Sequence, residues 1–175
     1  RLDGRLAGAP GMESASEFDP DDYHLTALRM EQWAGFVFVC YSADTPDLTT
    51  YFGDLTQRLA SHRFENFVCV RRREYQVDAN WKLIGETSME GYHIRALHNK
   101  SFYPYGYDNL NVVELFGRNS RIVFPFRRVE KLRDRPREEW SLQGCVTDVI
   151  QLFPNAHTST LTNHVMLIIL EPVSV

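Results

Sequence analysis

Two histidines and a carboxylate lie within nine residues of one another, between Glu90 and His98. Glu90 precedes His93 by three residues, and His98 follows His93 by five. Two imidazoles and one carboxylate, with the remaining positions open, form the ligand set that mononuclear Fe(II) oxygenases use. The segment therefore predicts a metal site that activates oxygen, and it leaves the identity of the substrate open.

The spacing of these residues constrains the backbone that carries them. Successive residues of an α-helix are rotated by about 100°, so His93 and His98 would point about 140° apart on a regular helix. The helix predicted from Asn80 to about Arg95 must then end or distort between the two histidines, and Asn99 is typical of such an end. Glu90 and His93 share one face, so Glu90 can hold the outward nitrogen of His93 and fix its tautomer.

Other interpretations of the histidines stay open at this point. A pair at this spacing is weak evidence for a metal site, and the aromatic residues that follow it fit either a core or a pocket. A zinc hydrolase is disfavoured, because its HExxH motif is absent from the sequence. The histidines at positions 24, 62, 157 and 164 have no partner at ligand spacing, and we expect them on the surface or satisfied within the core.

Composition narrows the class of protein. The chain has 175 residues, of which 43% are hydrophobic, enough to build a core. Its net charge of −4 argues against a nucleic-acid partner. No apolar run is long enough to predict a membrane span. Cys40, Cys69 and Cys145 are widely separated, which is typical of buried free thiols in a reducing, cytoplasmic compartment.

Hydrophobic patterning predicts an α+β fold with more strand than helix. The loop at 42–47 is a plausible domain boundary, and Asp47 or Thr49 could cap a short helix that extends to Ala60. The last two strands are expected to be antiparallel neighbours. Residues 2–6 are predicted to form a hairpin, and residues 129–140 a charged surface helix. Strands are predicted at 25–41, 68–77, 120–126, 146–153 and 164–170.

The stretch 80–98 also resembles a known family. Its pattern NWK…E…ExYHxxxxH is similar to the catalytic-domain signature of the α subunits of Rieske non-haem iron oxygenases, the aromatic-ring-hydroxylating type. Shorter stretches at 2–6, 31–39, 152–155 and 171–172 look like other parts of these subunits. The resemblance thus extends over nearly the whole chain, although only the histidine motif is specific.

The resemblance implies a fold, a site and partners. The fold would be an antiparallel-sheet, helix-grip (START-like) catalytic domain at 47–175, preceded by the last strands of a Rieske domain at 1–46. His93 and His98 would bind mononuclear Fe(II), and Glu90 would connect this site to a [2Fe–2S] cluster in the neighbouring subunit of a homotrimer or an α3β3 assembly. Electrons from NAD(P)H would arrive through a reductase or a ferredoxin, and O2 would hydroxylate an aromatic or other small organic substrate.

Three departures from the family pattern qualify this expectation. Thr87 stands where the family often has Asn, and the CxH…CxxH ligands of the cluster are absent. The family's iron carboxylate is an Asp well downstream of the histidines, and none of Asp108, Asp148 and Glu171 matches it, so the third ligand is left unassigned. We expect a fragment that is inactive alone. A catalytically silent helix-grip module that binds a ligand is the alternative.

Overall fold

The computed structural model describes residues 2–174, and the chain divides into two compact units. The first unit comprises the chain up to Tyr51 together with His62–Phe67. The second comprises Phe52–Ser61 and the chain from Val68 onward. No helix in the described range has the length and apolar composition that a membrane span requires.

The first unit is built around a two-stranded hairpin. Strands β1 (Arg29–Trp33) and β2 (Phe36–Cys40) are antiparallel, with Trp33 opposite Phe36. Ala34 and Gly35 form the two-residue turn, and both have positive φ angles, 51° and 84°, as the tight turns of hairpins require. The unit also contains the 3-10 helices η1 (Pro20–Asp22) and η3 (Phe64–Asn66), and most of helix α1 (Leu48–Phe52).

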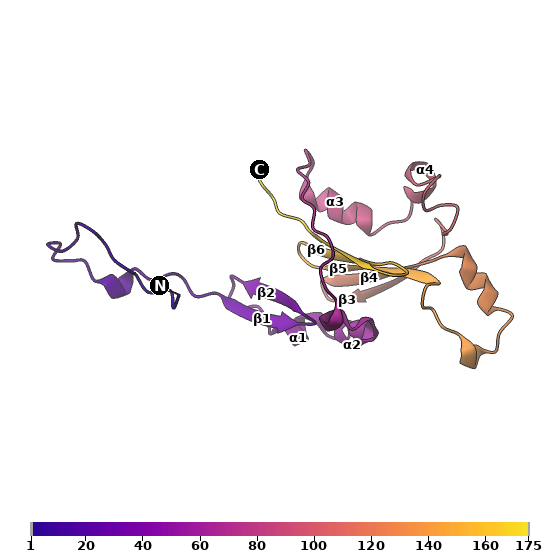
Figure 1. Ribbon diagram of the computed structural model, residues 1–175, viewed down its shortest axis with the longest axis horizontal. Helices are drawn as coiled ribbons and strands as arrows, with labels where there is room; N and C mark the ends of the chain where they lie inside the picture. The colour runs from indigo at the N-terminus through magenta and orange to yellow at the C-terminus, as the bar shows by residue number, and fades with distance from the viewer. Residues whose placement is uncertain (1, 175) are drawn as a thin grey trace. The chain divides into compact units, whose positions relative to one another are not determined.

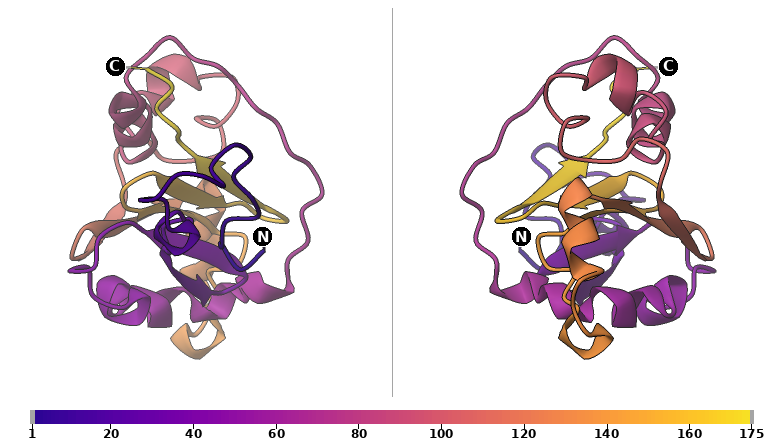
Figure 2. Two further views of the ribbon diagram at one scale, coloured as in Figure 1. Left: turned by 90° about the vertical axis from the view of Figure 1, so that its left-hand side faces the viewer. Right: turned by 90° about the vertical axis from the view of Figure 1, so that its right-hand side faces the viewer.

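The second unit is a five-stranded antiparallel sheet with helices on both faces. Its strands follow one another in chain order as β3 (Val112–Phe116), β4 (Asn119–Pro125), β5 (Val146–Leu152), β6 (Ala156–Thr160) and β7 (Val165–Ile169). Helices α3 (Trp81–Ser88) and α4 (Ile94–Leu97) lie on one side of the sheet, and α2 (Leu55–Leu59) lies on the other (Figures 1 and 2). The predicted α+β class with an antiparallel sheet is therefore confirmed.

The sheet buries one apolar layer beneath α3 and α4. Ile122, Phe124 and Val149 alternate onto this face and pack with Ile94 of α4. Met89, Phe102 and Tyr103 flank this cluster. The segment that carries the candidate iron ligands is thus anchored to the sheet by its own apolar residues.

Several strand predictions need correction. Residues 68–77 form no strand and are exposed, because their alternating apolar residues find no partner strand among the described residues. The strands predicted at 146–153 and 164–170 are not neighbours, since β6 lies between them. Residues 2–6 form no hairpin; instead, the carbonyl of Gly4 accepts a hydrogen bond of 2.9 Å from the amide of Leu25.

The helix predictions and the cysteine prediction were partly right. Asp47 does cap α1, since its carboxylate accepts from the amide of Thr50 at 2.9 Å. The helix expected at 129–140 consists of two short 3-10 helices, η4 (Arg127–Leu132) and η5 (Arg137–Glu139), on either side of Pro136. A further 3-10 helix, η2, spans Ala60–His62.

Cys69 is exposed rather than buried, because its segment does not join the sheet, whereas Cys40 and Cys145 are half-buried.

Candidate metal centre

Helix α3 directly precedes the candidate site in the chain. Asn80 caps its N-terminus, and its side-chain oxygen accepts from the amide of Lys82 at 3.0 Å. The hydroxyl groups of Thr87 and Ser88 donate to the carbonyls four residues before them, at 2.8 and 3.2 Å. Such bonds satisfy polar side chains within the last helical turn but favour bending of the helix.

The helix ends earlier than the sequence predicts. It stops at Ser88 instead of continuing to about Arg95, and the chain turns through 89–93 before α4 begins. The Glu90 carboxylate accepts from the amides of Tyr92 and His93, so it takes the place of the helix's own acceptors. The predicted break is present, but it precedes His93, and His98 follows the last residue of α4 as expected.

Glu90 and His93 also form a side-chain contact within the site. The His93 Nδ1 atom is hydrogen-bonded to a carboxylate oxygen of Glu90. Burial raises the pKa of Glu90, but the hydrogen bonds from the His93 side chain and from the amides of His93 and Tyr92 outweigh it, so the pKa lies below the usual value. A carboxylate acceptor at Nδ1 favours the proton on that nitrogen and leaves Nε2 with a free lone pair, as a metal ligand requires.

His98 is held by the turn that follows it. Its backbone carbonyl accepts from the amides of Ser101, Phe102 and Tyr103 at 2.9–3.1 Å. Its Nδ1 atom lies 3.3 Å from the Ser101 hydroxyl, so Nε2 is again the nitrogen without a partner among the described residues. Ser101 was not predicted as a site residue, although its position three residues after His98 was a usable signal.

The two imidazoles are brought together. Their ring centres are 5.2 Å apart, and the ring planes are inclined by 66°. Metal–nitrogen bonds of roughly 2.1 Å keep the ring centres of two shared ligands within about 6.5 Å of each other. The separation of the two rings lies within this limit.

A complete ligand set is not present in the described part of the chain. Among residues 2–174, no group of three or more His, Cys, Asp or Glu side chains is arranged to hold a metal. Asp108 approaches Arg95 at 3.8 Å, and Asp148 is paired with Arg121. The third ligand that the sequence analysis left unassigned therefore remains unassigned.

Two glycines allow the site to approach the sheet closely. A Cβ atom on Gly91 would lie 3.0 Å from both the Asp108 carbonyl oxygen and the Phe124 ring. A Cβ atom on Gly85 would lie 3.0 Å from Nε2 of His157. His157 is 1% exposed, and neither of its ring nitrogens has a hydrogen-bond partner. The sequence analysis expected this histidine on the surface or satisfied in the core, and it is neither.

Comparison with known proteins identifies the family of this chain. The family described as ring hydroxylating alpha subunit (catalytic domain) matches residues 64–175. The carnitine monooxygenase oxygenase subunit of Escherichia coli is 30% identical over 100 residues, which cover 56% of this chain and 27% of the relative. The large subunit of anthranilate 1,2-dioxygenase from Burkholderia cepacia is 31% identical over 107 residues, 55% of this chain and 25% of that protein.

Solved structures show the same fold. A quaternary ammonium Rieske monooxygenase superposes with a TM-score of 0.74 at 20% identity, over 97% of this chain and 45% of that one. The chain thus spans less than half the length of this structure and about a quarter of the curated relatives. Because the family match covers well over half of the chain, the chain belongs to the ring-hydroxylating α subunits, and the match to their catalytic domain covers residues 64–175.

Proposed function

We propose that this chain is part of the α subunit of a Rieske-type oxygenase, in which His93 and His98 hold a mononuclear Fe(II). The observation that carries the proposal is the pair of imidazoles 5.2 Å apart, with Glu90 on the far nitrogen of His93. When bound, the iron would supply the activation of O2 for hydroxylation of an organic substrate. We assign the third ligand to a carboxylate outside the described residues.

Glu90 has two roles in this proposal. Its hydrogen bond to Nδ1 orients the His93 ring and keeps Nε2 deprotonated. It is also half-exposed, with 41% of its side chain accessible, so a group from outside the chain can reach it. We propose that it links His93 to a [2Fe–2S] cluster in a neighbouring subunit, within a homotrimer or an α3β3 assembly supplied by a reductase or a ferredoxin.

The substrate is proposed as a small organic molecule. The relatives named above act on a quaternary ammonium compound, carnitine, and on an aromatic acid, anthranilate. A third, from Chromohalobacter salexigens, is a glycine betaine monooxygenase oxygenase subunit, 30% identical over 97 residues. Both compound classes therefore belong in a first substrate screen, with hydroxylation and demethylation products measured separately.

The finer details of the fold are proposals as well. We propose that residues 47–175 form part of a helix-grip domain, and that residues 1–46 are the last part of a Rieske domain. The antiparallel sheet covered by α3 and α4 supports the first assignment. The β1–β2 hairpin in a separate compact unit supports the second.

The Glu90→Ala variant of the complete protein tests the proposal. We expect it to retain iron but to lose electron delivery, so that product formed in a single turnover falls by roughly 10–100-fold. Iron content and quenched single-turnover product are the measurements. Asp134→Ala removes an exposed carboxylate outside the site and is the matched control. Normal single-turnover kinetics in Glu90→Ala would contradict the assigned role.

A further inference from the structure

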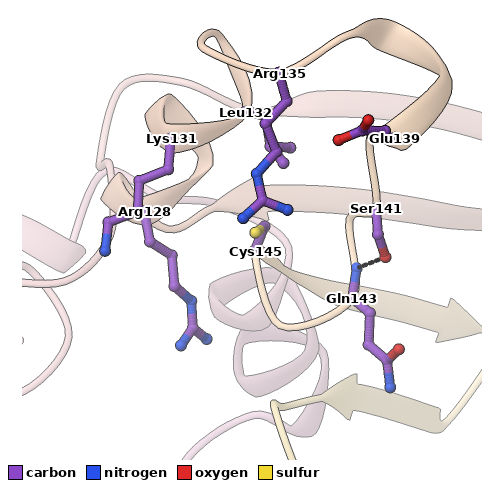
Figure 3. Close-up of a pocket in the computed structure, with 8 residues that line it drawn as sticks. All are labelled: Arg128, Lys131, Leu132, Arg135, Glu139, Ser141, Gln143 and Cys145. Atoms are coloured by element: carbon purple, nitrogen blue, oxygen red, sulfur yellow. Dashed lines mark hydrogen bonds between the residues drawn. The ribbon is translucent and has the colours of Figure 1, made fainter.

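A hollow of the sheet unit lies where the 3-10 helices η4 and η5 turn back into β5. It has a volume of about 270 Å³, and it is lined on one side by residues 128–135 and on the other by residues 139–145. Figure 3 shows that the cationic side chains come from the first stretch, and that Glu139, Ser141 and Gln143 come from the returning stretch. None of these residues belongs to the candidate metal centre.

The charge of this hollow is strongly unbalanced. Arg128, Lys131 and Arg135 line it, and none of the three forms an ion pair with any described residue. Glu139 is the one carboxylate among the lining residues. Three cations and one carboxylate leave a net charge of +2 around a small concave space. The positive electrostatic potential of these charges is focused by a concave wall of low polarizability.

Part of the hollow is held in place before any ligand arrives. The Arg128 guanidinium donates to the Thr162 hydroxyl at 2.8 Å and stacks 4.8 Å from the centre of the Phe126 ring. The carbonyl of Arg135 accepts from the indole nitrogen of Trp140 at 3.1 Å. Leu132 is buried beneath the cationic side chains. A preorganised guanidinium loses less conformational freedom when it binds an anion than a free surface arginine does.

We propose that this hollow binds a small oxyanion of charge −2, either a phosphate group or a dicarboxylate. Guanidinium groups match the geometry of both ions, and the Ser141 hydroxyl and the Gln143 amide group supply neutral donors on the opposite wall. The volume is below the roughly 300–1,000 Å³ of pockets that enclose drug-sized ligands, which suits a small ion. The site is independent of the iron, so it stands or falls separately from the proposed oxygenase function.

Calorimetric titration of the complete protein tests this proposal, with inorganic phosphate and succinate as the two probes. Saturable binding of phosphate alone identifies a phosphoryl ligand, binding of succinate alone identifies a dicarboxylate, and binding of both identifies a general dianion site. Arg128→Gln and Arg135→Gln should each weaken binding by roughly two- to fivefold, the range of exposed ion pairs. The triple variant that also carries Lys131→Gln should bind neither probe.

Two further variants test the direction of the change in binding affinity and supply a control. Glu139→Gln removes the opposing carboxylate, so binding should tighten, whereas a merely structural role for Glu139 would not strengthen it. Arg133→Gln removes a cation from the same segment that does not line the hollow, and should leave binding unchanged. Absence of saturation by both probes, or equal binding by the wild-type protein and the triple variant, would overturn the proposal.

Discussion

Two carboxylates of the sheet unit bind nitrogen groups in very different ways. Glu90 bonds to His93, three residues away, and to nearby amides, and 41% of its side chain is exposed. Asp148 bonds to Arg121 across two strands, with both carboxylate oxygens 3.0 Å from one guanidinium nitrogen, and its side chain is 4% exposed. The first contact is local and accessible, and the second is distant in sequence and buried.

This difference predicts that the buried contact, and not the accessible one, holds the fold together. Arg121 also donates to Glu114 of β3 at 2.5 Å, and Glu114 in turn pairs with Arg58 of α2 at 3.1 Å. This network joins three strands and a helix, whereas the Glu90–His93 contact joins residues of one turn. We therefore expect substitutions at the candidate metal centre to remove function without unfolding the protein. Substitutions at Asp148 should destabilise the fold, while the molecules that stay folded keep their function.

The largest effect is expected at the histidines. His93→Ala or His98→Ala should abolish turnover and iron retention in the complete protein, since each removes one of two adjacent imidazoles. The free energy of unfolding should change by only about 0.5 kcal/mol, because neither ring belongs to the buried apolar cluster. Iron content, product formation and chemical denaturation are the measurements. Product formation at the wild-type rate in either variant would break the comparison, and exposed His164→Ala is the control.

The reverse effect is expected at Asp148. Asp148→Ala leaves Arg121 half-buried with Glu114 as its remaining partner, and should destabilise the fold by about 3 kcal/mol, the lower end for a broken buried pair. Denaturant unfolding measures this loss, and iron bound per folded molecule should stay constant. Arg58→Ala is the matched control, because the Arg58 side chain is 59% exposed and its pair with Glu114 is worth about 1 kcal/mol or less. Similar losses in the two variants would contradict a special role for burial.

Gly91 lies between the candidate metal centre and the apolar core of the sheet, so its substitution should affect both iron binding and stability. In Gly91→Ala the new methyl group would meet the Asp108 carbonyl and the Phe124 ring at 3.0 Å, and Phe124 is buried in the core and has little room to move. We expect a destabilisation of about 1–3 kcal/mol, together with weaker iron binding as the chain shifts beside His93. Gly8→Ala, where nothing lies within 4 Å of the new methyl group, is the control. A stable Gly91→Ala protein with normal iron content would show that the contact is not restrictive.

The local chemistry of the site was readable from the sequence because it depends on short spacing. The five-residue spacing of His93 and His98 required a helix break, and the three-residue spacing of Glu90 and His93 predicted their contact. The exact place of the break was not predicted, since it depends on the Glu90 carboxylate accepting backbone amides and on Gly91 passing close to Phe124. The contact between Gly91 and Phe124 involves the sheet, which no local pattern describes.

Long-range pairing was the part that the sequence could not specify. Residues 68–77 carry apolar residues typical of a strand and residues 156–160 are mostly polar, yet only the second stretch became a strand, β6, between two others. Alternation shows that a segment can form a strand but does not identify a partner. The same limit applies to His157, whose burial follows from the position of Gly85 above β6 rather than from its neighbours in sequence.

The smallest effect is expected at His157 of β6, which lies next to Gly85 of helix α3. Burial lowers the pKa of His157 below its ordinary value of 6.5, so the unfolded chain takes up a proton at a higher pH than the folded protein does. Stability from this group is therefore fully present above pH 6.5 and is lost as the pH falls from there toward the folded-state pKa. His157→Leu removes the titrating group and keeps an apolar side chain beneath Gly85, so this part of the acid destabilisation should disappear. Unfolding free energies measured at a series of pH values test this, with His164→Leu on the exposed turn before β7 as the control. An unchanged pH profile in His157→Leu would mean that the imidazole has a partner, such as a buried water, that stabilises its charged form.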